Sequence, residues 1–302
     1  MPFDLFDKPG RFLRGNLHTH STNSDGALAP EEVSRRYRAM GYDFYALTDH
    51  FMAKYGFPIT DTRGHRDEGF TTLIGAELHA GRMSRGEIWH ILAIGLPFDF
   101  APTSAEETGP DLARRAAAAG AFVAIVHPEW YGLTLDDAEA LDAAHAIEIY
   151  NHTCHVHNAR GSGASLLDAL LSNGRRILAI ATDDAHFRDE VYDNTDAFGA
   201  WVMVKAEENE PEAILAALKA GDFYASEGPD FHAIHRDGDD LVVRTSAVDR
   251  VILLGPGARG AHVSGRAMTE ARLPLVGFDG GWLRLVAVDA AGRRAWSNAV
   301  WL

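Results

Sequence analysis

Residues 15–50 read GNLHTHSTNSDGALAPEEVSRRYRAMGYDFYALTDH and contain a complete strand–helix–strand pattern. The segment NLHTH predicts a strand. Pro30 and the acidic pair after it suit the first turn of a helix over residues 29–41, and Gly41 suits its end. DFYALTDH, residues 43–50, predicts a second strand. This order of elements indicates a βαβ unit and therefore a parallel sheet.

The same alternation continues to about residue 225. Strands are predicted over 70–80, 87–96, 121–128, 145–151 and 176–186, and helical patterns over 110–120, 137–144, 163–174 and 210–221. About seven such units within roughly 210 residues favour a barrel over an open sheet. The fold class expected from this pattern is α/β, with a largely parallel, TIM-like barrel.

The pattern changes after residue 226. DFHAIHRDGDDLVVRTSAVDRVILLG and WLRLVAVDAAGRRAWSNAVWL alternate with a period of two and are interrupted by Asp-Gly and Gly-Gly turns. We therefore expect a barrel over residues 1–225 and a small antiparallel β domain over residues 226–302. Trp296 and Trp301 are expected to pack in the core or between the domains. The long loop over residues 51–69 is a candidate lid.

Composition limits the classes of partner. The formal net charge of −15 argues against general binding to the nucleic-acid backbone, which requires a basic surface. It leaves a small anionic substrate possible, because bound metal ions reverse the local field. No apolar run approaches the ~20 residues of a membrane helix. The single cysteine, Cys154, and an N-terminus without a signal-peptide layout lead us to expect a cytoplasmic protein. Nothing in the sequence fixes the oligomeric state.

Residues that bind metal ions occur where predicted strands end. Twelve of the 15 histidines lie within residues 18–186. Side chains that are two residues apart on a strand point to the same face. The ends of the parallel strands of a barrel also converge on one rim. The candidate ligands are His18, His20, Asp25, His50, Glu77, His90, His127, Asp184 and His186. Nine ligands are too many for one metal ion and suit two or three ions, with Glu77 or Asp184 as a bridging ligand. Because no cysteine is among the ligands, the candidate metals are Zn, Mn and Fe.

The motifs HTHSTNSDG, LTDH, GAE, a histidine on the next strand, HP and DAH together resemble those of the PHP (polymerase and histidinol phosphatase) family. The resemblance implies a distorted seven-stranded (β/α) barrel with a trinuclear site. By the family pattern one ion would be held by His18, His20, Glu77 and Asp184, a second by Glu77, His90 and His127, and a third by Asp25, His50 and His186. Most of the family hydrolyses phosphoesters, and one branch, similar to carbaryl hydrolase, cleaves carbamates.

One segment departs from the phosphatase branches. Several of these place an arginine shortly after the HP motif, whereas HPEWYG has Glu129 and Trp130 there, and a carboxylate would repel phosphate. The overall layout is closer to the carbaryl-hydrolase-like branch. The sequence therefore predicts a metal-dependent hydrolase with a metal-activated hydroxide, and favours a phosphoesterase acting on a small phosphorylated substrate. The alternatives are a carbamate, ester or amide hydrolase with the same centre, or a metal-stabilised module without catalysis.

Further residues are candidates for other roles in the site. Asp49 is predicted either to orient the hydroxide or protonate the leaving group, or to support the metal ligands. The candidates for substrate binding are His79, Glu148, Asn151 and His152, with backbone capping or a plain rim position as the alternative. His155 and His157 are expected in a solvated loop, and Cys154 in packing. His65, with Arg63 and Arg66, is either an anion grip or part of a solvated loop.

Overall fold

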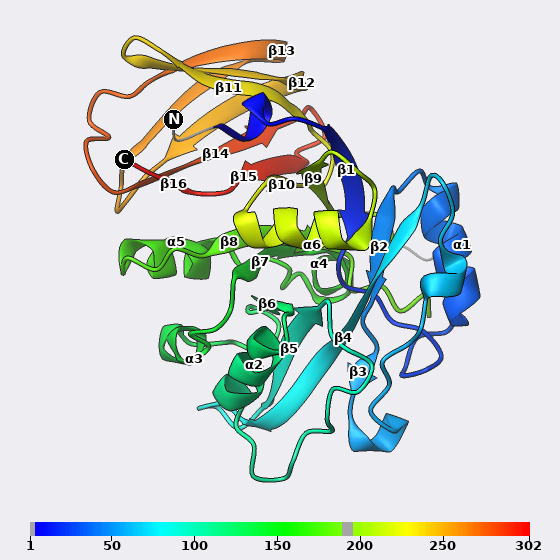
Figure 1. Ribbon diagram of the computed structural model, residues 1–302. Helices are drawn as coiled ribbons and strands as arrows, with labels where there is room; N and C mark the ends of the chain where they lie inside the picture. Colours follow the sequence, from blue (N-terminus) through cyan, green and yellow to red (C-terminus); the bar gives the residue numbers. More distant parts are fainter. Residues whose placement is uncertain (1–3, 189–195) are drawn as a thin grey trace.

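The computed structural model describes residues 4–188 and 196–302, and its centre is one large mixed sheet (Figure 1). Neighbouring strands follow the order β11-β12-β14-β15-β10-β9-β1-β2-β4-β5-β6-β7-β8. The strands are β1 Arg11–Asn16, β2 Phe44–Leu47, β3 His50–Phe51, β4 Thr71–Arg82, β5 Ile88–Ile94, β6 Phe122–Ile125, β7 Ala146–Asn151, β8 Leu178–Thr182, β9 Trp201–Ala206, β10 Phe223–Ser226, β11 Phe231–Asp237, β12 Asp240–Leu254, β13 Gly260–Pro274, β14 Trp282–Val288, β15 Arg294–Ser297 and β16 Val300–Trp301.

Within residues 4–188 and 196–302, six α-helices and three short 3-10 helices connect these strands. They are α1 Pro30–Ala39, α2 Gly109–Ala118, α3 Leu135–Ala140, α4 His152–Asn158, α5 Ala164–Ser172, α6 Pro211–Ala220, η1 Asp4–Asp7, η2 Ala53–Tyr55 and η3 Arg63–His65. Five α-helices match the predicted helical patterns. Helix α4 was expected as a loop; the side chain of Asn151 caps its first turn by accepting a hydrogen bond from the Cys154 backbone N–H. No helix of the described residues is long and apolar enough to cross a membrane.

The α/β class is confirmed, but the sheet is mixed and does not close. Strand β1 pairs in parallel with β2 and antiparallel with β9, while β5 is antiparallel to both β4 and β6. Both edges of β1 and both edges of β9 are therefore occupied, and neither strand offers a free edge to β8. The sheet instead runs from β9 through β10 into the C-terminal strands. This is why a largely parallel, closed barrel is not found.

The segments after β1 and β8 nevertheless lie side by side. An isolated parallel bridge joins Thr19 to Ala185, and the backbone N–H of Asp184 donates to the carbonyl of His18 at 2.9 Å. A strand was predicted over residues 16–20, but the observed strand β1 spans Arg11–Asn16 and so begins and ends earlier. The HTH segment is a buried extended stretch beyond it. Two metal-binding motifs that are 164 residues apart in the sequence are thus brought into contact by the backbone.

The C-terminal part is built from antiparallel strands, as predicted, and has no helix. In Figure 1 it lies above the strands of the N-terminal part. Strand β10 pairs with β9 on one side and β15 on the other, so the sheet continues across residue 226. Trp296 is buried and its ring lies 5.8 Å from that of Tyr150, in agreement with its predicted packing. The division into domains at residues 225 and 226 stays a prediction.

A half-buried ion pair joins the C-terminal strands to helix α5. The guanidinium of Arg284, on β14, is 3% exposed and donates to both carboxylate oxygens of Asp168, on α5, at 2.7 and 2.8 Å. Replacing Asp168 by alanine leaves a buried charge without its partner. We expect the free energy of unfolding, measured by urea titration, to fall by about 1–3 kcal/mol.

A matched control is the exposed pair between Arg114 and Asp142, in which the side chains are 51% and 59% exposed. The Asp142→Ala substitution should change the free energy of unfolding by less than about 1 kcal/mol. Equal effects of the two substitutions would contradict a structural role for the half-buried pair.

Candidate metal centre

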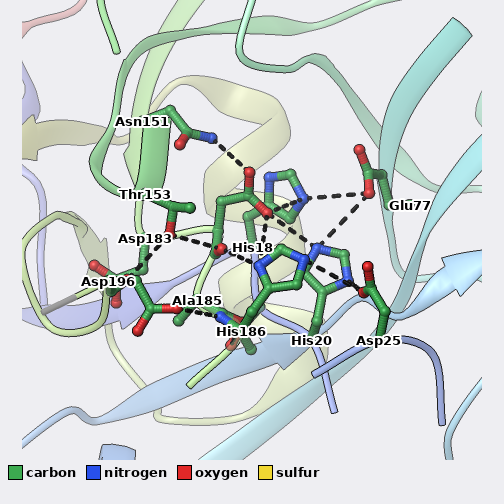
Figure 2. Close-up of polar contacts among 12 residues, drawn as sticks. His18, His20, Asp25, Glu77, Asn151, Thr153, Asp183, Ala185, His186 and Asp196 are labelled. Carbon is green, nitrogen blue, oxygen red and sulfur yellow. Dashed lines mark hydrogen bonds and ion pairs between the residues drawn. The ribbon is translucent and has the colours of Figure 1, made fainter. Parts of the chain in front are cut away.

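All nine predicted metal ligands converge in one region. Figure 2 shows several of these side chains pointing toward one another from segments far apart in the sequence. Their ligand atoms form four overlapping groups in which all atoms lie within 4.8 Å of one another. The groups are His20, Asp25, His50 and His186; His50, Glu77, His79 and His90; His18, His127 and Asp184; and His18, His20 and Glu77. Shared members make this a single centre.

The predicted ligand residues come from within strands and from the connections after them. Glu77 and His90 lie on β4 and β5, and the register pairs Glu77 with His50 of β3. His127 follows β6, and Asp184 follows β8. Both have positive φ, 29° and 57°, in the left-handed region that residues other than glycine seldom adopt. Such conformations cluster at functional sites, because the surrounding structure must hold them.

Glu77 lies at the middle of the centre. One carboxylate oxygen, Oε1, is 2.7 Å from Nδ1 of His90 and 3.1 Å from Nε2 of His127; the other, Oε2, is 2.5 Å from Nδ1 of His50. The residue is fully buried. Burial by itself would raise its pKa, but the nearby charges of His50 and His90 outweigh burial and hold the pKa of Glu77 well below its ordinary value. Glu77 is therefore an ionised bridge between histidines.

A second carboxylate, Asp184, lies between the two histidines of the HTH segment. Its Oδ1 is 3.0 Å from Nε2 of His20 and 3.3 Å from Nε2 of His18. Burial lowers the pKa of His20, and the neighbouring His186 and His50 lower it further, to about 3. His20 is therefore a neutral imidazole at neutral pH, which is the form that binds metal ions.

Asp25 uses its two carboxylate oxygens differently. Oδ1 faces the centre, 3.4 Å from Nε2 of His50 and 3.3 Å from Nε2 of His186. Oδ2 faces Arg188, whose Nη2 is 2.5 Å away, while Nε of Arg188 donates to the backbone carbonyl of Asp25. Sequence reasoning missed Arg188, because nothing in its spacing relates it to Asp25, 163 residues earlier.

Several of the predicted ligand atoms are buried and, apart from ion-pair contacts such as those given above, lack a hydrogen bond within the described part of the chain. These atoms are His18 Nε2, His20 Nδ1, Asp25 Oδ1, Glu77 Oε2 and His127 Nδ1. Buried polar atoms are nearly always satisfied in folded proteins, so a set of five in one place needs a further partner. Imidazole nitrogens and carboxylate oxygens are also the donors that divalent transition metals prefer. The residues present therefore fit a divalent metal site.

Glu148 and Asn151 lie behind the predicted ligands and do not line the cavity over the centre, so their role in substrate binding stays a prediction. Glu148 is fully buried; its Oε1 is 2.8 Å from Nδ1 of His18, and its Oε2 accepts from the backbone N–H of His127 at 2.6 Å. Asn151 donates to Glu148 and to Asp184, at 2.9 and 3.2 Å. A carboxylate on the second nitrogen of a ligand histidine fixes the orientation of the ring.

Asp49 anchors the loop that carries Asp25. Its Oδ1 accepts from the Ser21 backbone N–H at 2.7 Å and the Ser24 hydroxyl at 2.6 Å, and its Oδ2 accepts from the Ser21 hydroxyl at 2.7 Å. It is buried and does not line the cavity over the centre. These contacts support the ligand loop directly, and a catalytic role for Asp49 stays a prediction.

The centre opens into a cavity of about 320 Å³. Its remaining walls come from Trp130, Thr153, Cys154, His157 and Arg188. The Trp130 ring lies 5.6 Å from His90 and 5.2 Å from His127. The carboxylate of Glu129 points elsewhere, since it accepts a hydrogen bond from the backbone N–H of Ser162 at 2.9 Å, and Glu129 does not line the cavity. The carboxylate of Glu129 is therefore not placed to repel a phosphate group bound in the cavity.

The other candidates are distributed around this cavity. His157 lines it, although it was expected in a solvated loop, because helix α4 carries it there. Cys154 is buried and burial raises the pKa of its thiol, in keeping with the predicted packing role. His79 is buried beside His50, and Nε2 of His79 lies 2.9 Å from Nδ1 of His50. His152 lines a different cavity.

The loop over residues 51–69 does not bring His65 to the centre. Nδ1 of His65 lies 2.7 Å from the Ser34 hydroxyl, beside helix α1. Arg63 pairs with Asp61 at 2.6 Å, and Arg66 donates to the Thr72 carbonyl at 2.9 Å. An anion grip at the metal centre is therefore not formed: His65 and Arg66 join the loop to α1 and β4, and Arg63 pairs within the loop.

Comparison with solved structures supports the same fold. A two-domain protein from Bacteroides vulgatus ATCC 8482, which contains a predicted PHP-like metal-dependent phosphoesterase, aligns with 97% of this chain and 96% of its own, with 17% identity and a TM-score of 0.55. The PHP resemblance is thus confirmed at the level of the fold, and the alignment extends over nearly the whole length of both chains. No family model and no curated protein matches the sequence.

Two further structures are similar over shorter stretches. One is a candidate metal-dependent phosphoesterase from Bifidobacterium adolescentis ATCC 15703. The alignment covers 57% of this chain and 87% of that chain, with 15% identity and a TM-score of 0.41. The other is an amidohydrolase from Chromobacterium violaceum with bound sulfate, with 17% identity, the same two coverages and a TM-score of 0.39. Their TM-scores are too low to carry an argument.

Proposed function

We propose that this chain is a PHP-type metal-dependent hydrolase that acts on a small phosphorylated substrate. The observation that carries the proposal is the convergence of nine nitrogen and oxygen ligands, several with buried atoms that lack a hydrogen bond, beneath an open cavity. The division of ligands among three ions, taken from the family pattern, remains part of the proposal. The restriction of the metal to Zn, Mn or Fe is also part of the proposal, and it rests on the absence of cysteine from the ligand groups.

Bound divalent ions would supply Lewis-acid polarisation of the scissile group and would lower the pKa of water to about 7, which provides the nucleophile at neutral pH. Three ligand carboxylates, from Asp25, Glu77 and Asp184, contribute a charge of about −3, so two or three divalent ions leave the centre positive. A positive centre favours an anionic substrate.

The protein's own residues would position the ligands and the substrate. Glu148 holds the ring of His18, and Asp49 holds the loop of Asp25. Arg188 places a guanidinium at the cavity wall, where it can bind an anionic oxygen in the way that an arginine after the HP motif does in other phosphatases. Trp130 offers a flat apolar surface for the leaving group.

The test is to assay protein reconstituted with Mn²⁺ or Zn²⁺ on p-nitrophenyl phosphate, bis-p-nitrophenyl phosphate, p-nitrophenyl acetate and an aryl carbamate. We expect the phosphomonoester to have the highest kcat/KM. The Arg188→Gln substitution should raise KM for this substrate by about tenfold or more, because it removes charge-assisted hydrogen bonds, and should affect the acetate much less.

Arg63→Gln is the matched control, since Arg63 is exposed, pairs with Asp61 and lies outside the cavity. Metal content must be equal in all three proteins, because Arg188 also contacts Asp25. Hydrolysis of the acyl substrates alone would replace the proposal by the carbamate, ester or amide alternative. No hydrolysis by metal-loaded protein would favour a module without catalysis.

A further inference from the structure

A second cavity, of about 740 Å³, lies on the opposite side of helix α4 from the metal centre. Its walls come from β1, α4, the segment before β9, the start of β9 and the turn between β14 and β15. Thr153, Cys154 and His157 of α4 face the metal cavity, whereas His152, His155 and Val156 of the same helix line the second one. The helix therefore separates two distinct cavities.

Arg14 is the residue that marks this cavity as a binding site. Its guanidinium lies over two aromatic rings, 3.7 Å from the centre of the Trp201 ring and 4.2 Å from that of Tyr42. Its backbone N–H donates to Asp43, but Nε is buried and has no hydrogen bond among the described residues. None of the ion pairs of the described chain includes this guanidinium. Arg14 is half-buried and lines the cavity, so a ligand there that supplies an anionic acceptor would pair with its charge.

A second unsatisfied donor lies next to the first. The indole Nε1 of Trp201, another wall residue, is also buried without a hydrogen-bond partner in the described part of the chain. Indole N–H groups usually find an acceptor when they are buried. Two adjacent donors without acceptors, one of them charged, indicate a ligand with anionic oxygens.

The other arginines of the walls already have carboxylate partners. Arg293, on the β14–β15 turn, pairs with Asp289 at 2.7 Å, and Arg294, the first residue of β15, lies 4.0 Å from Glu227. The carboxylate that lines the cavity, from Glu227, is already engaged, since it accepts from the backbone N–H of Arg294 at 2.8 Å, and burial raises its pKa. Of the three arginines that line the cavity, Arg14 is therefore the one without an ion pair among the described residues, and it is the charge that an anionic ligand would meet.

The cavity is also shaped for a flat molecule. Tyr150, Phe198 and Trp201 supply aromatic walls, and the volume falls within the range of small-molecule sites. We propose that this cavity is a second binding site, separate from the metal centre, for a planar organic anion such as an aryl carboxylate, sulfonate or phosphate, with Arg14 and Trp201 as its anchors.

Naphthalene-1-sulfonate is a suitable probe, because it is planar and anionic but binds metal ions weakly. Isothermal titration calorimetry on the full, metal-loaded chain should detect its binding. Arg14→Gln should weaken this binding by about tenfold or more, since a hydrogen bond to a charged group is lost. Arg188→Gln, the same substitution at the other cavity, should leave it unchanged.

Because Arg14 packs between two rings, its replacement could unfold the protein, and a second variant avoids this. Arg294 has a side chain that is 52% exposed, so Arg294→Ala should fold normally and still weaken binding severalfold. The proposal is overturned if the wild-type protein does not bind the probe in the millimolar range, if folded Arg14→Gln or Arg294→Ala protein binds as well as wild type, or if Arg188→Gln is the variant that loses binding.

Discussion

Replacing Glu77 by glutamine is expected to abolish metal binding at the centre and to lower kcat/KM for a phosphomonoester by at least about 100-fold. Glutamine has the same shape but no charge, and Glu77 meets His50, His90 and His127 with its two oxygens. Loss of residues behind metal ligands already costs about 10- to 100-fold in affinity or activity, so loss of a shared ligand should cost more. Elemental analysis and steady-state kinetics would measure the two effects.

Glu129→Gln provides the control for this substitution. In the sequence, Glu129 follows the HP motif, whose His127 lines the cavity. Its carboxylate, however, accepts a hydrogen bond from the backbone of Ser162, and Glu129 does not line the cavity. This variant should keep its metal and most of its activity. A Glu77→Gln protein with a full complement of metal would show that the carboxylate is not a ligand, and the proposed function would lose its main support.

The elements of the fold could largely be predicted from local patterns. The helix over residues 30–39 shows its start in Pro30 and its end near Gly41, and the structure agrees. The closure of the sheet could not be predicted in this way, because it depends on which edges of β1 and β9 are already taken. Pairing between strands distant in the sequence leaves no trace in the periodicity of either strand.

Helix α4 shows a different limit of sequence reasoning. Its seven residues contain three histidines and no apolar periodicity, so a solvated loop was the simpler expectation. The helix is instead held by the Asn151 cap and by its position between two cavities, one lined by His157 and the other by His155. Tertiary surroundings can outweigh weak local propensity in this way.

The candidate site was predictable where chemistry and spacing coincide. HTH and DAH place ligand types at positions that share a face, and the structure brings them together at the bridge between Thr19 and Ala185. Arg188 and Glu148 were harder to place, since an arginine or a glutamate near a strand end has many possible partners. Only the three-dimensional arrangement sets Arg188 against Asp25 and Glu148 against His18.

Removing the metal ions with a chelator is expected to lower the melting temperature by roughly 6 °C. An ion that binds only the native state adds about 4 kcal/mol of stability at 1,000 times its dissociation constant, and each kcal/mol corresponds to roughly 1.5 °C in a chain of 302 residues. The physical reason is the buried set of atoms without hydrogen bonds at the centre, which bound ions would satisfy.

Differential scanning fluorimetry at one scan rate, before and after chelation and after metal is restored, would measure this shift. The Glu77→Gln protein serves as the control, since it should already melt at a low temperature and respond little to the chelator. If wild-type protein shown to be free of metal melts at the same temperature as the loaded form, the ions do not support the fold. The unsatisfied atoms of His18, His20 and Glu77 would then need another partner, and an ordered water cluster would be the next candidate.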